Sequence, residues 1–297
     1  MTDVADFLVH LRDNVGLTVP TIEGYRSAIS SVIPEVGTCK TLSDLLKSFA
    51  KDIPRDRPKK VHWNLDVVLQ FLRSDRFEPL EACSLRDLTM KTLFLLALAT
   101  AKRVSELQAL SHVVGFSRDG ALLSYIPSFI AKNETPSHQV PRSIKVRGLY
   151  GLVGRDLGEI INCPVRSLKV YLERTKNIRG PSKNLFCSIE NPSNKLVKNG
   201  ISWLIRALIR QAHHSVSQEF LPLCRVRAHD VRAVSTSVAF LRNTPVQAVI
   251  DTATWKTNSV FASHYLRDLS FKFGDVYSLG PVVSADSVGV GAPESQA

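Results

Sequence analysis

An arginine and a glutamate directly follow the most apolar segment of this sequence. The run Leu93–Ala99 leads into Thr100–Leu107, which carries Arg103 and Glu106. A guanidinium group that an apolar helix carries toward the interior is costly unless an anion meets it. The spacing makes Glu106, one helical turn later, one possible partner, and an anionic ligand is the other. The first question is therefore which anion Arg103 meets.

Three further groups of side chains could take part in chemistry. Lys132 follows a predicted strand, where a turn can direct its amine into a cleft. His229 and Arg232 lie three residues apart, so a helix would place both on one face. Trp255 and Tyr265 lie in the next segment of the chain. Together with the first arginine, these are the candidate catalytic residues.

Each candidate also has a plain structural explanation. Arg103 could pair only with Glu106, and on spacing alone that is the simpler interpretation. A single lysine such as Lys132 is most often an ordinary surface residue. His229 could cap a helix beside a solvated arginine, and most tyrosines and tryptophans pack in cores or interfaces. Taken one at a time, these residues identify no reaction.

Taken together and in this order, the candidates resemble the catalytic set of the tyrosine recombinases, the phage-integrase-like enzymes. That set runs arginine, lysine on a β-hairpin, His-x-x-Arg, histidine or tryptophan, and tyrosine. The first box of the family often reads Thr-Gly-x-Arg-x-Ser-Glu-Leu, to which Thr100–Leu107 is similar. Through Cys163–Leu172 and His264–Asp268 the sequence most resembles the recombinases of DIRS-type eukaryotic mobile elements.

The sequence departs from the common members of that family at three points. Ala101 stands in place of the usual glycine of the first box. Trp255 stands where many members have histidine, although some have tryptophan. The step from Trp255 to Tyr265 is 265 − 255 = 10 residues, one more than in common bacterial members. The placement of Tyr265 is therefore the part of the resemblance that most needs structural support.

The resemblance implies that Tyr265 attacks a DNA phosphodiester, forming a 3′-phosphotyrosine link and a free 5′-hydroxyl. A 5′-hydroxyl later attacks that link, so the bond energy is conserved and no nucleotide cofactor is needed. Arg103 and Arg232 would hold the non-bridging oxygens of the transition state in a planar fork. Lys132 would be the general acid for the departing oxygen, and His229 would assist the nucleophile or hold a phosphate oxygen. The tryptophan would donate its indole N–H and form a packing wall.

The composition is that of a basic protein with a packed core. Of the 297 residues, 44% are hydrophobic, and 38 Lys and Arg against 27 Asp and Glu give a net charge of +11. Such a surface attracts polyanions, and the resemblance makes double-stranded DNA the expected partner. Five scattered cysteines without a Cys-x-x-Cys pair disfavour a disulfide framework and a zinc site. With no carboxylates clustered at ligand spacing, we expect no metal and no cofactor.

Further expectations concern assembly and location. The resemblance implies a homo-tetramer on DNA and a nuclear protein if the source is eukaryotic, or otherwise a cytoplasmic one. No apolar stretch approaches the roughly 20 residues that span a bilayer, so we expect no membrane partner, and we expect no small-molecule substrate. Two other interpretations stay open: a recombinase-derived protein that binds DNA without cutting it, and a helical interaction scaffold whose match is accidental.

The expected fold is mainly α with a small antiparallel β-sheet. The resemblance divides it into a helical core-binding domain at 1–58, a catalytic domain at 59–280 and a flexible tail at 281–297. A proline-containing, charged linker ends the first domain. This linker, Lys51–Lys60, could be a solvated loop between helices or a strap across phosphates, and the basic residues that a strap would use are Arg55, Arg57, Lys59 and Lys60.

Apolar periodicity locates the individual elements. The predicted helices are Val4–Arg12, Thr21–Ile33, Thr41–Ala50, Leu65–Leu72, Ser84–Ala99, Val165–Arg174, Ile201–Ala212, His229–Leu241 and Val246–Thr252. The predicted strands are Gly120–Ile126, Ser128–Ala131 and Ser143–Val146.

Overall fold

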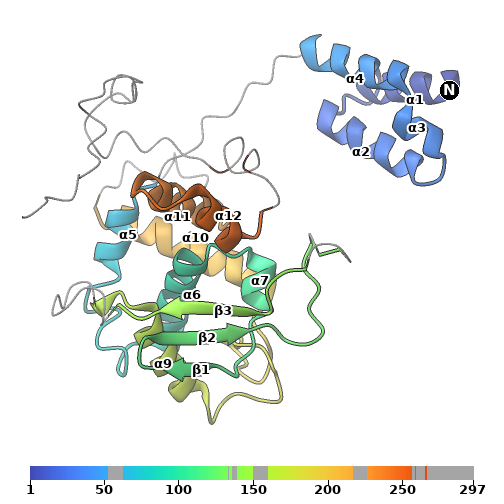
Figure 1. Ribbon diagram of the computed structural model, residues 1–297. Coiled ribbons are helices and arrows are strands. Elements are labelled where there is room, and N and C mark those ends of the chain that lie inside the picture. Colours follow the sequence, from blue (N-terminus) through green and yellow to red (C-terminus); the bar gives the residue numbers. More distant parts are fainter. Residues whose placement is uncertain are drawn as a thin grey trace, which may run out of the picture. The chain divides into compact units, whose positions relative to one another are not determined.

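The computed structural model divides the chain into two compact units, Met1–Lys60 and Val61–Ala297 (Figure 1). The residues that it describes are 1–52, 63–132, 134–135, 139–149, 160–216, 226–255, 258 and 265. The four linker residues expected to contact phosphates, Arg55, Arg57, Lys59 and Lys60, lie outside this set, as does the predicted tail at 281–297.

The N-terminal unit is a small helical bundle. Its helices are α1 (Thr2–Asp13), α2 (Val19–Ser30), α3 (Pro34–Thr38) and α4 (Lys40–Asp52). Helix α3 was not predicted, because one and a half turns are too short to show apolar periodicity. Helix α4 continues two residues into the predicted linker. The unit has a core of its own, formed by Leu8, Leu11, Val19, Ile22, Val36, Leu42, Leu46 and Phe49.

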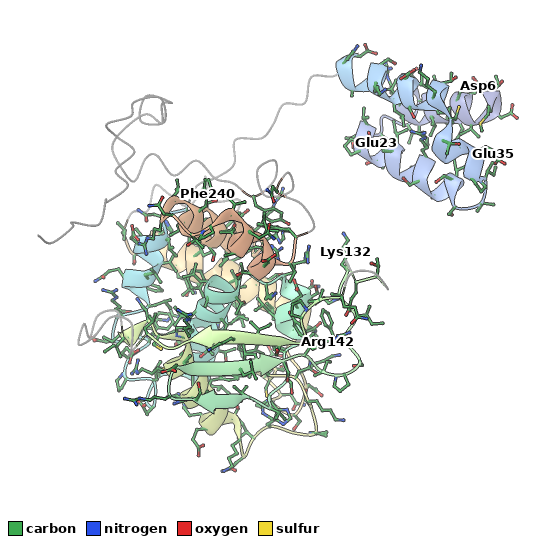
Figure 2. The ribbon with its side chains drawn as sticks, viewed as in Figure 1. Asp6, Glu23, Glu35, Lys132, Arg142 and Phe240 are labelled. Carbon is green, nitrogen blue, oxygen red and sulfur yellow. The ribbon has the colours of Figure 1, made fainter. Side chains whose placement is uncertain are left out.

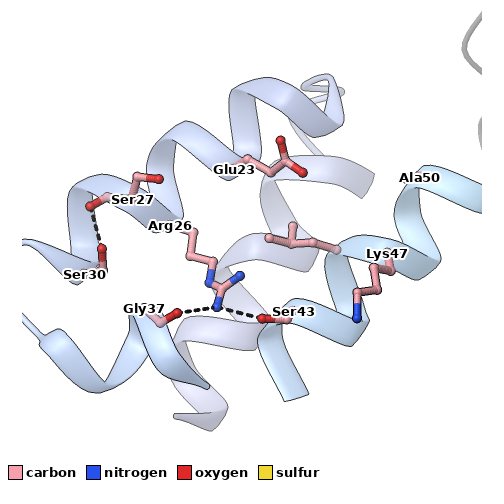
Figure 3. A pocket seen from close by; sticks show the side chains of 9 residues that line it. Glu23, Arg26, Ser27, Ser30, Gly37, Ser43, Lys47 and Ala50 are labelled. Atoms are coloured by element: carbon pink, nitrogen blue, oxygen red, sulfur yellow. Dashed lines mark hydrogen bonds between the residues drawn. The ribbon is translucent and has the colours of Figure 1, made fainter. Parts of the chain in front are cut away.

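A polar cavity of about 560 Å³ lies in this unit, lined by residues of α2, α3 and α4 (Figure 3). The guanidinium group of Arg26 projects into it from α2. It donates hydrogen bonds to the carbonyl oxygens of Val36 at 3.1 Å and Gly37 at 3.0 Å, and to Ser43 Oγ at 2.9 Å. These hydrogen bonds from Arg26 therefore satisfy backbone carbonyls at the end of α3 and connect α3 to α2 and α4.

The C-terminal unit is built around α6 (Leu85–Thr100), which is buried along most of its length. Ser84 caps its first turn by accepting a hydrogen bond from the Asp87 N–H at 3.0 Å. The other helices among the described residues of this unit are α5 (Leu65–Phe71), α7 (Val104–Gln108), α9 (Pro164–Thr175), α10 (Lys198–His214), α11 (Asp230–Leu241) and α12 (Val246–Ala253). Helices α9, α10 and α11 all pack against α6. Among the described residues, no helix is both long and apolar enough to cross a bilayer.

A three-stranded antiparallel sheet lies beside these helices (Figure 1). Strand β2 (Gly120–Ser124) is central, between β1 (Gly115–Ser117) and β3 (Ser143–Arg147). A side chain at Gly120 would lie 2.1 Å from the Val146 carbonyl oxygen, so only glycine fits there. The prediction of a mainly helical fold with a small antiparallel sheet is confirmed.

One predicted strand is wrong. Residues 128–131 lie in the connection between β2 and β3, and they form no ladder. Pro127 starts a turn in which the Phe129 N–H donates to the Ile126 carbonyl at 3.1 Å. The Ala131 N–H donates to the Glu134 carboxylate at 2.8 Å. Because these backbone groups find local partners, the apolar run does not pair as a strand.

A partly buried ion triad joins the connection between α5 and α6 to α6 itself and to α9. Glu78 accepts bonds from Arg166 at 2.7 and 2.8 Å and also pairs with the fully buried Lys91. Lys91 also donates to the Leu72 carbonyl at 2.7 Å. Burial alone would raise the pKa of Glu78, but the bonds from Arg166 and Lys91 lower it below its usual value. The triad therefore stabilises the fold at neutral pH, and this contribution is lost as the pH falls below about 4.5.

We expect Glu78→Gln to lower the free energy of unfolding by about 3 kcal/mol, because it leaves Lys91 charged and buried without its anion. Urea denaturation at neutral pH measures the change. Glu190→Gln, which alters an exposed carboxylate in the connection between α9 and α10, is the matched control and should have little effect. Equal losses in the two variants would contradict a specific role for the triad.

Candidate active site

The first arginine is positioned by a sharp turn between two helices. Helix α6 ends at Ala101, whose backbone is left-handed with φ 50° and ψ 29°, and Arg103 then caps the start of α7. Glycine adopts this conformation freely, whereas alanine pays about 1 kcal/mol. The backbone thus gives a physical reason for the glycine that the resembled box has at this position. Alanine keeps the same turn at a small cost.

The two candidate arginines converge on one buried carboxylate. Arg103 Nη1 lies 3.4 Å and Arg232 Nη1 3.7 Å from the same oxygen, Glu106 Oε2. The Arg103 backbone N–H also donates to this oxygen, at 2.9 Å. Glu106 is only 1% exposed. In this structure, therefore, the anion that meets Arg103 is Glu106, which also brings Arg232 to the same point.

Arg232 is the more deeply buried of the two, with 1% exposure. Its Nη1 donates to the Ala101 carbonyl at 2.8 Å, and its Nη2 donates to the Ala253 carbonyl. Within the described part of the chain, its Nε has no hydrogen-bond partner. Burial, followed by the nearby charge of Arg103, lowers the pKa of Arg232 to about 10. The guanidinium group is thus held rigidly and retains N–H groups for another acceptor.

Aromatic rings cover the same guanidinium group. Its central carbon lies 4.7 Å from the ring centre of Trp255 and 5.4 Å from that of Tyr265. The two rings are themselves 4.3 Å apart. The Tyr265 hydroxyl lies 2.7 Å from His229 Nε2, at hydrogen-bonding distance. Four of the residues singled out in the sequence therefore touch one another here, and Arg103 joins them through Glu106.

Lys132 is not part of this cluster. It is exposed in the connection between β2 and β3, and Figure 2 shows its side chain directed away from the sheet. Among the described residues it makes no hydrogen bond or ion pair. Arg142, at the end of the same connection, donates hydrogen bonds to the Glu134 carboxylate at 2.6 Å and to the Phe129 carbonyl at 2.8 Å, and thereby holds the connection together.

Two residues of the cluster were not singled out in the sequence. Lys102 is buried, and its Nζ donates to the Thr252 carbonyl at 3.0 Å. Burial lowers its pKa to about 8, although the charge of Glu106 acts in the opposite direction. The Tyr125 hydroxyl donates to Glu106 Oε1 at 3.4 Å, and burial raises the pKa of this phenol. The reasoning applied to Arg103 could have found Lys102, because both cations follow the same apolar helix.

The two-unit fold with this helical bundle and three-stranded sheet is that of the tyrosine recombinases. The Tn1549 transposon integrase in complex with transposon right end DNA matches with a TM-score of 0.55 at 13% identity, over 92% of this chain and 82% of that chain. The XerH site-specific recombinase bound to a palindromic difH substrate, in a post-cleavage complex, matches with a TM-score of 0.53 at 14% identity, over 93% and 71%. No protein-family model and no curated protein match the sequence. The similarity establishes the fold, and the chemistry has to be argued from the residues.

We expect Glu106→Gln to lower the free energy of unfolding by about 3 kcal/mol, because the amide leaves several buried cations without a counter-charge. Chemical denaturation at neutral pH measures the loss. Glu173→Gln, on the exposed face of α9, removes the same charge from the surface and should be nearly neutral. A Glu106→Gln variant as stable as the Glu173→Gln variant would mean that Glu106 does not hold the arginines together.

Proposed function

We propose that this protein is a DNA strand transferase that breaks and rejoins DNA through a 3′-phosphotyrosine intermediate. The observation that carries the proposal is a surplus of positive charge beside a tyrosine hydroxyl. Arg103, Arg232 and Lys102 surround one carboxylate, Glu106, so 3 − 1 leaves a charge of +2 in a largely buried cluster. Such preorganised cations stabilise the charge that develops on a phosphate under attack.

The contacts of Tyr265 support its role as the nucleophile. Its hydroxyl lies 2.7 Å from His229 Nε2, which can accept the phenolic proton. Attack of the phenolate oxygen on phosphorus forms the phosphotyrosine bond and breaks the bond to the 5′-oxygen. Arg103 and Arg232 would hold the non-bridging oxygens during this step. Trp255, stacked on both Arg232 and Tyr265, would keep the ring and the guanidinium group in register.

Lys132 is proposed as the general acid that protonates the departing 5′-oxygen. Its location in the connection between two antiparallel strands supports this assignment, because the resembled set has lysine on a β-hairpin. The exposed amine makes no ion pair with the described residues, so it is available to a bound duplex. Lys132 would approach the cluster only when DNA is bound.

The proposed partner is duplex DNA, bound mainly through its phosphates. The net charge of +11 supports this partner, as do the DNA complexes named for the Tn1549 integrase and XerH. We further propose site-specific recombination as the reaction, a homo-tetramer on DNA as the assembly, a DIRS-type mobile element as the origin and the nucleus as the location. These finer proposals rest on the resemblance of the sequence.

A recombinase-derived protein that binds DNA without cutting it is the second candidate. One observation favours it: two terminal nitrogens of Arg232 already donate to backbone carbonyls, and the aromatic rings cover the group. A phosphate would have to reach Arg232 through N–H groups that are buried here. The experiment below separates the two functions.

We expect the protein to form a covalent adduct with a nicked suicide DNA substrate, and Tyr265→Phe to abolish it, because phenylalanine has no oxygen to attack phosphorus. Denaturing electrophoresis detects the adduct, and a mobility-shift assay measures DNA binding separately. The matched control is Tyr25→Phe, which removes the hydroxyl of an exposed tyrosine in the N-terminal unit. This variant should form the adduct normally. DNA binding without an adduct in the unaltered protein would favour the second candidate.

We expect Arg232→Lys to slow adduct formation by about 100- to 1,000-fold, the loss that typically follows removal of one preorganised donor to the transition state. Lysine keeps the charge but not the planar fork. Single-turnover rates at saturating DNA measure the effect. Arg242→Lys, an exposed position just past the end of α11, should leave the rate unchanged. An unaltered rate in Arg232→Lys would remove the guanidinium group from the proposed mechanism.

A further inference from the structure

Lys102 links two segments that lie far apart in the chain. It belongs to the short turn between α6 and α7, and its Nζ donates to the Thr252 carbonyl in the last turn of α12, at 3.0 Å. Its side chain is buried, with 7% exposure of the residue. The first box of the resembled family leaves this position open, so the resemblance assigns no role to Lys102.

The contact satisfies the end of α12. The last carbonyl groups of a helix have no partner within the helix, and cations near them also interact favourably with the helix dipole. Two of these carbonyls in α12 accept hydrogen bonds from cations: Thr252 from Lys102 and Ala253 from Arg232. Arg232 donates to the Ala101 carbonyl as well. The turn that precedes Arg103 and the end of α12 are therefore joined by two cationic side chains.

The end of α12 determines the position of Trp255. Directly after the helix, Thr254 has a left-handed backbone with φ 55°, and Trp255 follows with its backbone N–H donating to the Ile250 carbonyl at 3.0 Å. The ring of Trp255 then lies against Arg232 and Tyr265. A shift of the last turn of α12 would move this ring and thereby its contact with Tyr265.

We propose that Lys102 is a positioning residue, whose ammonium group holds the end of α12, and with it Trp255 and Tyr265, against the turn that carries Arg103. The inference rests on the proposed function, in that Tyr265 is the residue to be positioned. Its ammonium group donates to backbone, so it positions these residues through α12, in addition to the charge that it contributes to the cluster.

The charges around Lys102 make this contact sensitive to pH. The facing groups are Glu106 from α7, Arg103 from the turn and Arg232 from α11. Burial lowers the pKa of Lys102 to about 8, so the amine loses its charge as the pH rises through that value. A neutral amine donates a weaker hydrogen bond to a carbonyl, so the hold on α12 weakens above about pH 8.

Fluorine NMR of the full chain labelled with 5-fluorotryptophan tests the positioning without DNA. The chain has three tryptophans, Trp63, Trp203 and Trp255, and Trp255→Phe assigns the third resonance. We expect Lys102→Met to shift the Trp255 resonance while Trp63, in the core, and Trp203, on the exposed side of α10, stay in place. Lys102→Arg should leave the Trp255 resonance close to its position in the unaltered protein. Lys176→Met, which removes an exposed lysine, is the matched control and should change nothing.

A pH titration of the unaltered protein gives a second, independent readout. The Trp255 resonance should move with a midpoint near pH 8, and Lys102→Met should abolish that step. A step that persists in Lys102→Met would come from another group and is thereby distinguished. A Trp255 resonance that neither shifts in Lys102→Met nor titrates near pH 8 overturns the proposal. If Lys102→Met also shifts the Trp63 resonance, the variant has disturbed the core, and the pH titration of the unaltered protein then decides whether the proposal holds.

Strand cleavage supplies the functional readout. If the protein forms the covalent adduct, Lys102→Met should slow single-turnover cleavage on the order of 10-fold, the effect of losing one hydrogen bond to a charged group, while DNA affinity is retained. If Lys102→Met shifts the Trp255 resonance but leaves the cleavage rate unchanged, the proposed link between the position of Trp255 and the reaction is wrong. If no adduct forms at all, the proposed function fails, whereas the fluorine spectra still decide whether Lys102 positions α12.

Discussion

The arrangement of this site depends on a single buried carboxylate. Glu106 is reached by Arg103 and Arg232 through the same oxygen and by Tyr125 through the other. Cations packed this closely in an environment of low dielectric constant would repel one another without it. Burial lowers the pKa values of Arg232 and Lys102, and because one carboxylate cannot balance these two cations and Arg103, repulsion between the cations lowers them further. The residual positive charge gives an anionic ligand a favourable place to bind.

The same cations complete the backbone hydrogen bonding of the surrounding helices. Arg232 and Lys102 donate to carbonyls at the ends of α6 and α12, so each serves packing and electrostatics at once. Stability and the proposed reactivity are therefore coupled at these positions, and we expect a substitution there to change both. For this reason the conservative exchanges, arginine to lysine or lysine to arginine, are more informative than truncation to alanine.

The sequence predicted the long helices well, because apolar periodicity over three or more turns is a strong signal. It missed α3, α7 and β1, which are too short to show a period, and it assigned a strand to Ser128–Ala131, where local turn contacts prevailed over apolar character. Five of the six candidate residues, all except Lys132, lie together in the structure, and their catalytic roles stay a prediction. Lys102 follows the same apolar helix as Arg103 and could have been singled out with it, but its partner, the Thr252 carbonyl, could not have been named, because sequence patterns do not reveal tertiary hydrogen bonds to backbone.

Ala101 illustrates how a mildly unfavourable residue can serve this arrangement. Its left-handed backbone is strained for alanine, yet its carbonyl accepts the bond from Arg232. The methyl group disfavours this left-handed conformation, so tertiary contacts, among them the bond from Arg232, have to hold the turn in place. Loss of that bond would therefore release the junction of α6 and α7 more readily than it would with glycine, which adopts the same conformation freely.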